Sequence, residues 1–337
     1  MIIIVLGWIA LILTGLKIKD REIEEALGIR QCNVLKGICA VEILIGHIGF
    51  ITEDPLLFLN RKAGVLFVGI FFFFSGYGLM YSKEHKPDYM KGLFFKKAIS
   101  ILGPAYIIYV LFQIIDWCLS GNIDYICSII NPVRFFYANN WFIWEIILFY
   151  LLFSVIYRIR NIMLANGILV AISLMFIAAG FITKIENPWY GSTLCFPVGI
   201  LFYQCRKIIS LFLKKYWFKS ILTGTALVIV FTLTFFIMGN ESIIGNPVSR
   251  NLAAIFFCIT TVAALCKMSI GNKATAFLGN CSYEIYLIHP YVLAELRDRI
   301  TEPFVYAITV IIITVILAYF IKSAEKQLGK VRNAKHV

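Results

Sequence analysis

The chain has 337 residues, of which 60% are hydrophobic and 15% are charged. A water-soluble protein carries roughly a quarter of charged residues, so the composition excludes an ordinary soluble enzyme and indicates an integral membrane protein. The net charge of +12 does not call for a nucleic-acid partner, because membrane proteins concentrate Lys and Arg in their cytoplasmic loops.

Eleven apolar runs are candidates to cross the roughly 30 Å hydrocarbon core of a bilayer. They lie at about 1–17, 34–51, 63–81, 99–119, 141–157, 162–183, 190–204, 219–238, 251–267, 278–296 and 303–321. The connecting segments are short, so we expect one all-α integral membrane domain over residues 1–337, a polytopic bundle of about 10–11 transmembrane helices.

The two ends of the chain flank this bundle. The first run, 1–17, lacks the basic leader of a secretory signal and is followed by positive charges, so we expect a retained helix. Residues 323–337 form a basic tail. If the segment 18–33 is cytoplasmic, 24 of the 31 Lys and Arg residues fall inside and 7 fall outside. This bias predicts the N-terminus outside and the C-terminus in the cytoplasm.

The second run reads VLKGICAVEILIGHIGF and carries Lys36, Glu42 and His47. Eleven helical steps bring His47 back to within about 20° of the face of Lys36, roughly 16 Å further along the axis. One stripe therefore offers a cation near the cytoplasmic end and an imidazole in the outer half. Ionisable groups at such depth are functional candidates. The alternatives are that Lys36 snorkels to the interface and that His47 is a hydrogen-bonded packing residue.

Two later runs place polar groups at a comparable depth. Glu145 enters its helix from the outside and could share a level with His47; the alternative is a carboxylate at the lipid interface. In LGNCSYEIYLIHP, Tyr286 and His289 are three residues apart and share a face. His289 could serve catalysis or a structural hydrogen bond, and the sequence leaves both open.

The run FFFFSGYGLMYS contains small residues of the kind that let membrane helices approach closely. Gly76 and Gly78 are therefore predicted packing positions. The Ser75 hydroxyl could bond to its own helix, and no general base lies near it in the sequence. The nine cysteines show no CxxC pair and no zinc-like spacing, so no metal site is predicted.

These motifs together resemble the membrane-bound acyltransferase 3 family. The resemblance is carried by LKGICAVEILIGH with its basic residue and histidine, by the FF-x-x-SG-Y stretch from Phe71 to Tyr77, by the Trp-led helix from Trp141 to Tyr150, and by the segment from Gly279 to His289. The motifs occur in family order over residues 30–325. Three features depart from the family. Many members have Arg in place of Lys36, and Glu145 is spaced differently from the family's acidic residue. Members usually have ten helices, so the segment 1–17 is expected to be an extra N-terminal helix outside the acyltransferase-like core 30–325.

The resemblance implies a multi-pass protein of the cell membrane, of bacterial type, that acylates acceptors on the outer side. The implied donor is acetyl-CoA or another acyl-CoA, no bound cofactor is implied, and the implied acceptor is a hydroxyl of a glycan or other envelope component. The implied site residues are His47, Glu145 and His289 for catalysis, Lys36, Arg30 and Ser75 for the donor, and Trp141 and Tyr286 for the substrate. His47 would act as general base or form an acyl-histidine.

Two other classes of membrane protein are weighed against this interpretation. A transporter or exporter of a sugar or lipid-linked intermediate would move its cargo without acyl transfer, and such folds often show paired broken helices in related halves. No such repeat is evident in this sequence. A structural or lipid-binding protein would not need the Lys36 and His47 stripe.

Overall fold

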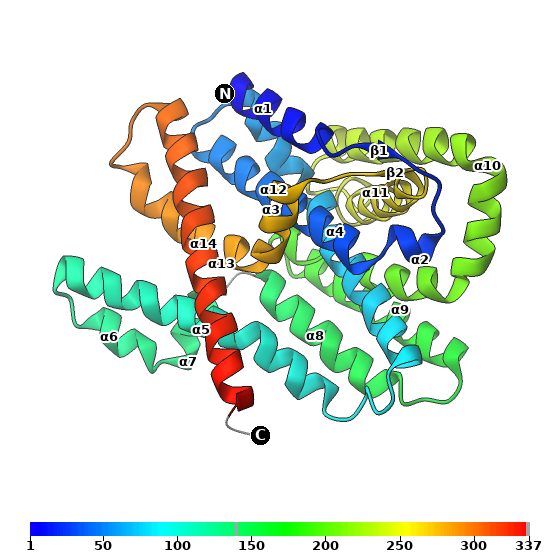
Figure 1. The fold of residues 1–337 in the computed structure, drawn as a ribbon, viewed down its shortest axis with the longest axis horizontal. Helices are drawn as coiled ribbons and strands as arrows, with labels where there is room; N and C mark the ends of the chain where they lie inside the picture. Colours follow the sequence, from blue (N-terminus) through cyan, green and yellow to red (C-terminus); the bar gives the residue numbers. More distant parts are fainter. Residues whose placement is uncertain (139–140, 335–337) are drawn as a thin grey trace.

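The computed structural model describes residues 1–138 and 141–334, and the chain forms a bundle of α-helices (Figure 1). The first half comprises α1 (Ile2–Leu13), β1 (Lys17–Ile18), α2 (Ile23–Ala26), α3 (Ile29–Ile51), α4 (Pro55–His85), α5 (Leu93–Ser120), α6 (Asp124–Ile129), α7 (Pro132–Ala138) and α8 (Trp141–Ile156). The second half comprises α9 (Ile162–Ile182), the 3₁₀ turn η1 (Asn187–Trp189), α10 (Cys195–Met238), the π-helical turn η2 (Ile244–Val248), α11 (Ser249–Leu265), β2 (Met268–Ser269), α12 (Lys273–Asn280), α13 (Ser282–Arg297) and α14 (Pro303–Ala334).

Within the described part of the chain, seven helical segments are long and apolar enough to cross a membrane. They are α3, α4, α5, α9, α10, the run Ile244–Leu265 that joins η2 to α11, and Pro303–Gln327 of α14. The apolar helices α1 and α8 are shorter. The all-α membrane class is therefore confirmed, while the number of crossings and the orientation stay predictions.

Several predicted segments have different boundaries in the structure. Helix α1 has 12 residues and rises about 18 Å, less than a full crossing. The runs 190–204 and 219–238 fall largely in α10, which folds back on itself (Figure 1) and whose backbone leaves the helical region at Tyr216 (φ −125°, ψ 26°). The run 278–296 is divided at Cys281 into α12 and α13. The predicted tail continues α14 as far as Ala334, and its last three residues lie outside the described part.

Side-chain caps fix where some of these helices begin. Oδ1 of Asp54 accepts hydrogen bonds from the backbone N–H groups of Leu56 and Leu57, both at 3.0 Å, which starts α4. At α12 the Asn272 side chain accepts from the Thr275 N–H, and the Thr275 hydroxyl oxygen accepts from the Asn272 N–H. This capping box sets the helix that leads into the histidine-bearing α13.

Helix α4 lies at the centre of the bundle, against α3, α10 and α11. A Cβ atom at Gly76 would lie 2.2 Å from the Phe196 carbonyl oxygen, and one at Gly199 would lie 2.1 Å from the Phe73 carbonyl oxygen. The backbones of α4 and α10 therefore meet at these glycines, which confirms the packing prediction for Gly76. The prediction for Gly78 was wrong, because a Cβ there would meet no atom within 4 Å.

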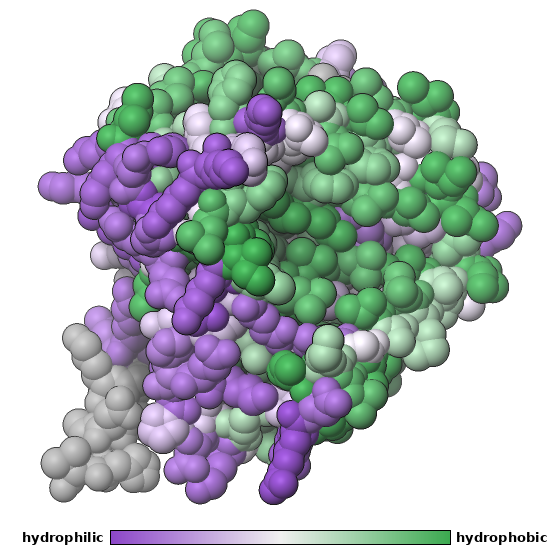
Figure 2. Space-filling view, turned by 90° about the vertical axis from the view of Figure 1, so that its right-hand side faces the viewer, coloured by the Kyte–Doolittle hydropathy of each residue, from purple (hydrophilic) through white to green (hydrophobic). Residues whose placement is uncertain are grey.

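The surface of the bundle suits a lipid environment. Figure 2 shows apolar residues over much of one face, with polar residues gathered along one side. Large apolar side chains are exposed on several of the long helices, among them Phe95, Met163, Phe218, Ile237 and Phe320. Since contiguous exposed apolar surface of this extent is not tolerated in water, it is the surface of a membrane protein.

Three of the segments that the charge count assigns to the inside, around residues 17–22, 210–214 and 267–269, contact one another. The strands β1 and β2 pair antiparallel, with Lys17 opposite Ser269. Nearby, Lys267 pairs with Asp20 at 2.7 Å and Lys214 pairs with Glu22 at 2.5 Å. The hydrogen bond from Lys214, followed by that from Ser210, holds the pKa of Glu22 below its ordinary value. Polar contacts therefore connect these three predicted cytoplasmic segments.

Candidate active site

A cavity of about 560 Å³ opens beside the C-terminal half of α3. Its wall includes four of the predicted site residues: His47 of α3, Trp141 at the start of α8, and Tyr286 and His289 of α13. Helix α13 packs directly on α3, so residues more than 200 positions apart in the sequence meet in one wall. We call this the outer cavity, after the predicted orientation.

The two histidines are in ring contact within this wall. The centroids of the His47 and His289 imidazoles are 5.0 Å apart, and their planes are inclined by 40°. The Tyr286 ring lies 5.7 Å from that of His289, as the three-residue spacing predicts. His47 is exposed whereas His289 is only 2% exposed, so His47 is the histidine that a substrate in the cavity can reach.

Both histidines are held in the same tautomer by their own helices. His47 Nδ1 lies 2.9 Å from the Ile43 carbonyl oxygen, and His289 Nδ1 lies 3.1 Å from the Ile285 carbonyl oxygen. A carbonyl oxygen can only accept, so Nδ1 carries the hydrogen in each ring. The Nε2 atom of a neutral ring then keeps its lone pair, which is the arrangement that a base or a nucleophile requires.

A second cavity, of about 160 Å³, lies on the Lys36 side of α3. We call it the inner cavity. Lys36 and Ser75, both half-buried, line it together with Tyr150 and Tyr283. Lys97 of α5 brings a second cation close, because its Nζ lies 5.6 Å from the centroid of the Tyr150 ring. The sequence had shown Lys97 only as one of many inside charges.

The two cavities share three residues of their walls. Ile43, Val68 and Tyr286 line both of them, and we call these three residues the neck. Ile43 lies between Lys36 and His47 on α3, as the helical spacing requires. The predicted stripe therefore faces two hollows that share part of their walls.

Close packing around Gly279 brings α12 and the start of α13 against α3. A Cβ at Gly279 would lie 2.0 Å from the Asn33 carbonyl oxygen, and one at Gly37 would lie 2.5 Å from the Gly279 nitrogen. The side-chain nitrogen of Asn33 also donates to the Asn280 side-chain oxygen at 2.6 Å. The first glycine of the Gly279 to His289 motif thus has a structural reason, which is to let α13 begin beside Lys36.

Glu145 does not meet His47 as its depth in the sequence suggested. It is buried, and its Oε1 accepts a hydrogen bond from the Thr193 hydroxyl at 2.7 Å, while its Oε2 has no partner among the described residues. It lines neither cavity. The position of a residue along a helix fixes the level of its side chain but not the direction in which the side chain points around the helix axis. The Glu145 carboxylate points toward the segment that leads into α10.

Two more residues of the Lys36 helix lie away from the cavities. Arg30, predicted to contact the donor, is exposed at the start of α3 and lines neither cavity. Glu42, for which the sequence offered no role, accepts a hydrogen bond from the Trp8 indole N–H at 2.9 Å. Helix α1 is therefore attached to the middle of α3 by a polar contact.

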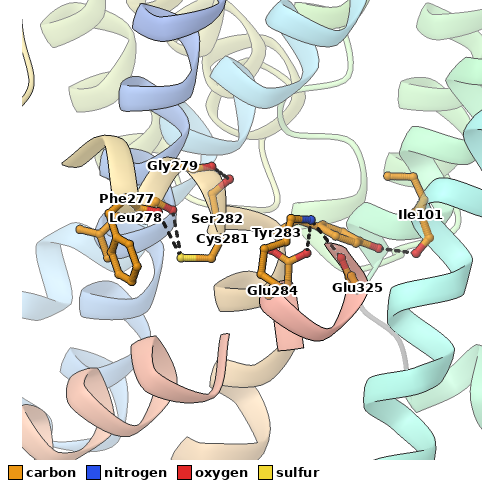
Figure 3. Close-up of polar contacts among 10 residues, drawn as sticks. Ile101, Phe277, Leu278, Gly279, Cys281, Ser282, Tyr283, Glu284 and Glu325 are labelled. Carbon is orange, nitrogen blue, oxygen red and sulfur yellow. Dashed lines mark hydrogen bonds and ion pairs between the residues drawn. The ribbon is translucent and has the colours of Figure 1, made fainter. Parts of the chain in front are cut away.

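Glu284, inside the histidine-bearing motif, has a structural partner. Its carboxylate is fully buried and pairs with Lys322 of α14 at 2.8 Å, and Lys322 also pairs with Glu325 at 3.0 Å. Figure 3 shows Glu284 and Glu325 side by side at this junction, with the neighbouring Tyr283 hydroxyl donating to the Ile101 carbonyl oxygen at 2.8 Å. These contacts fix the first turn of α13 against α14 and α5.

Comparison with known proteins identifies the family. The family model described as "Acyltransferase domain" (Acyl_transf_3) matches residues 29–322, a range that contains α3, α13 and both cavities and leaves out α1. No curated protein and no solved structure matches the chain. The chain therefore belongs to the acyltransferase 3 family and is a membrane acyltransferase.

Proposed function

We propose that the protein transfers an acyl group, with acetyl as the simplest case, from acyl-CoA at the inner face to a hydroxyl of a glycan or other envelope acceptor outside the cell membrane. The observation that supports this most is the pair of adjoining cavities along α3. One holds Lys36, the other holds His47, and both share the neck residues. Such an arrangement suits two substrates that reach one reaction centre from opposite sides.

At the inner end, cations would hold the phosphates of the donor. Lys36 lines the inner cavity and Lys97 lies beside it. Both charges attract an anionic ligand, and the thioester arm would extend through the neck toward His47. Ser75, in the same wall, offers a hydroxyl to the amide groups of this arm. Arg30 would assist only from the exposed surface of the inner face.

At the outer end, His47 would act as the general base. Its Nε2 takes the proton of the acceptor hydroxyl while the hydroxyl oxygen attacks the thioester carbonyl carbon. The tetrahedral intermediate collapses, the carbon–sulfur bond breaks, and the proton held by His47 passes to the departing thiolate. His289 would position the His47 ring, and Trp141 and Tyr286 would provide aromatic surfaces for the acceptor. Glu145, bonded to Thr193, would support the fold of this wall.

The test uses membrane vesicles that contain the full-length protein, given radiolabelled acetyl-CoA at the inner face. We expect the wild type to transfer label to an external glycan and His47→Ala to transfer none. Lys36→Met should raise the KM for the donor, and Lys36→Arg should restore part of the affinity for the donor. An acyl-histidine route would leave label on the protein when the acceptor is withheld. Uptake or export of a sugar without label transfer would instead favour a transporter.

A further inference from the structure

The outer end of the outer cavity is lined by donors and carries no acidic group. Lys62 and Arg250 line it, together with Ser192, Asn187 and Asn240. No Asp or Glu is among the described residues of its wall, although Glu186 and Glu241 are chain neighbours of two of them. A hollow of this composition has a positive potential that favours an anion.

Arg250 is the central residue of this arrangement. It follows the π-helical turn η2 at the start of α11, and among the described residues no carboxylate lies within ion-pair distance of it. Its guanidinium stacks on Phe235, with its carbon 4.0 Å from the ring centroid, and donates a 3.4 Å hydrogen bond to Asn240. The side chain is half-buried, and its Nε atom is buried without an acceptor. A buried donor without an acceptor costs free energy, and an anionic ligand could supply the missing acceptor.

Ser192 gives a second and independent sign of a ligand. Its side chain is 1% exposed, it lines the same cavity, and its Oγ has no hydrogen-bond partner among the described residues. The preceding residue, Gly191, lies against the Arg250 stem: a Cβ there would be 3.4 Å from Arg250 Cδ. A buried hydroxyl and a buried guanidinium N–H, both unsatisfied, thus belong to residues that line one cavity.

The frame around these two residues is fixed by hydrogen bonds. The Asn246 side chain donates to Asn187 Oδ1 at 2.6 Å, and the Asn251 side chain donates to the Tyr190 carbonyl oxygen at 2.7 Å. The Leu194 N–H donates to Asn251 Oδ1 at 3.0 Å. These bonds join the loop that carries Ser192 to η2 and to the start of α11, which carries Arg250, so the donors are positioned before any ligand arrives.

We propose that the acceptor bears an oxyanion, a carboxylate or a phosphate diester, which binds Arg250 and Ser192 while its hydroxyl meets His47. Lys62 at the exposed rim adds a second positive charge. This inference rests on the proposed transfer to an external acceptor and narrows it to acidic acceptors. A guanidinium can engage such groups through two parallel hydrogen bonds.

The test measures binding and transfer separately, on the purified protein in nanodiscs. Three tetramers of similar length serve as probes: neutral maltotetraose, tetragalacturonate, and a glycerol tetramer joined by phosphodiesters. Calorimetry gives the binding constants, and labelled acetyl-CoA gives the transfer rates. We expect one or both charged tetramers to bind at least about tenfold more tightly than the neutral one, and added salt to reduce the difference. The two charged probes distinguish a carboxylate from a phosphate acceptor.

The variants locate the preference. Arg250→Gln should weaken binding of the charged tetramer by about 10- to 100-fold and leave the binding of maltotetraose unchanged. Arg250→Lys should keep part of the affinity for the charged tetramer. Ser192→Ala should weaken binding of the charged tetramer by a smaller factor than Arg250→Gln. Arg297→Gln, which removes an exposed arginine at the end of α13 that lines neither cavity, is the matched control. Thermal unfolding checks that each variant is folded.

Three results would overturn the inference. The first is equal binding of neutral and charged tetramers. The second is a loss of CoA binding in Arg250→Gln, which would assign the cavity to the donor. The third is equal transfer to all three probes, which would reject the acidic acceptor and leave the proposed function intact. A charge preference in binding without any transfer would reject the function and leave the anion site.

Discussion

His47 and His289 lie in ring contact across the interface of α3 and α13, with ring centroids 5.0 Å apart. The pair is unequal, because His47 is exposed to the outer cavity and His289 is almost fully buried behind it. We therefore propose that His47 contacts the substrate and that His289 positions the His47 ring.

This division of roles predicts different effects for the two residues. His289→Leu should lower kcat by up to about 100-fold, the size of effect that follows from a displaced catalytic group, with little change in the donor KM. His289→Asn should retain more activity than the leucine variant. Because the buried ring faces His47, the pH profile of kcat should also move in His289→Leu, which a purely structural residue would not cause.

The control for the histidine variants is His85. It is exposed, stacks on Tyr81 with a centroid distance of 4.2 Å, and lines neither cavity. His85→Ala should keep the wild-type rate and pH profile. Wild-type kcat in His289→Leu would contradict the assignment.

The neck between the two cavities should control passage of the acyl arm. Val68 is buried and lines both cavities. Val68→Trp should block transfer while CoA and acceptor each still bind, at a stability cost of about 1–3 kcal/mol for overpacking. Val68→Ala widens the same position and should keep transfer. Equal transfer rates in the tryptophan and alanine variants, measured with labelled acetyl-CoA, would show that the arm takes another path.

The buried ion pair between α13 and α14 should matter for stability more than for chemistry. Lys322→Met leaves the fully buried Glu284 carboxylate without its partner, which should lower the free energy of unfolding by about 3–5 kcal/mol. The double variant Glu284→Leu with Lys322→Met removes both charges and should recover much of the loss. Thermal unfolding in detergent measures the stability of the single and the double variant. If Lys322→Met is as stable as the wild type, the ion pair does not stabilise the fold.

The contact between Trp8 and Glu42 should attach α1 to the bundle. Trp8→Phe keeps the aromatic ring and removes the N–H donor, so it should cost about 1–2 kcal/mol and make α1 easier to proteolyse. Glu42→Gln keeps an acceptor oxygen and should have a smaller effect. Transfer activity should persist in both, because α1 lies outside the matched range 29–322. Unchanged proteolysis of α1 in Trp8→Phe would argue against the attachment.

The predicted orientation can be tested with cysteines already in the chain. All nine are unpaired, and Cys118, Cys127 and Cys205 are exposed. Cys118 and Cys127 lie at the predicted outer ends of the bundle and Cys205 lies beside the inside residue Arg206. In single-cysteine variants, a membrane-impermeant maleimide should label the first two in intact cells and Cys205 only after permeabilisation. Labelling of Cys205 in intact cells would reverse the orientation.

The sequence identified the relations that a single helix fixes by itself. The pitch of an α-helix sets the angle and the rise between two residues without reference to any other part of the chain. Lys36 and His47 therefore had to share a stripe, and Tyr286 and His289 had to share a face. The apolar runs indicated the membrane class in the same local way, and the distribution of Lys and Arg predicted the orientation.

The tertiary structure decided which helices are neighbours. The contact of His47 with His289 depends on α3 packing against α13, and the partners of Glu145 and Glu42 depend on the azimuths of α8 and α1. Nothing in the sequence pointed to Arg250 and Ser192 as site residues. Arg250 was one of the charges counted on the predicted outer side, and Ser192 was an ordinary polar residue. Whether a donor is buried without an acceptor depends on atoms from distant segments, so it can be seen only once the chain is packed.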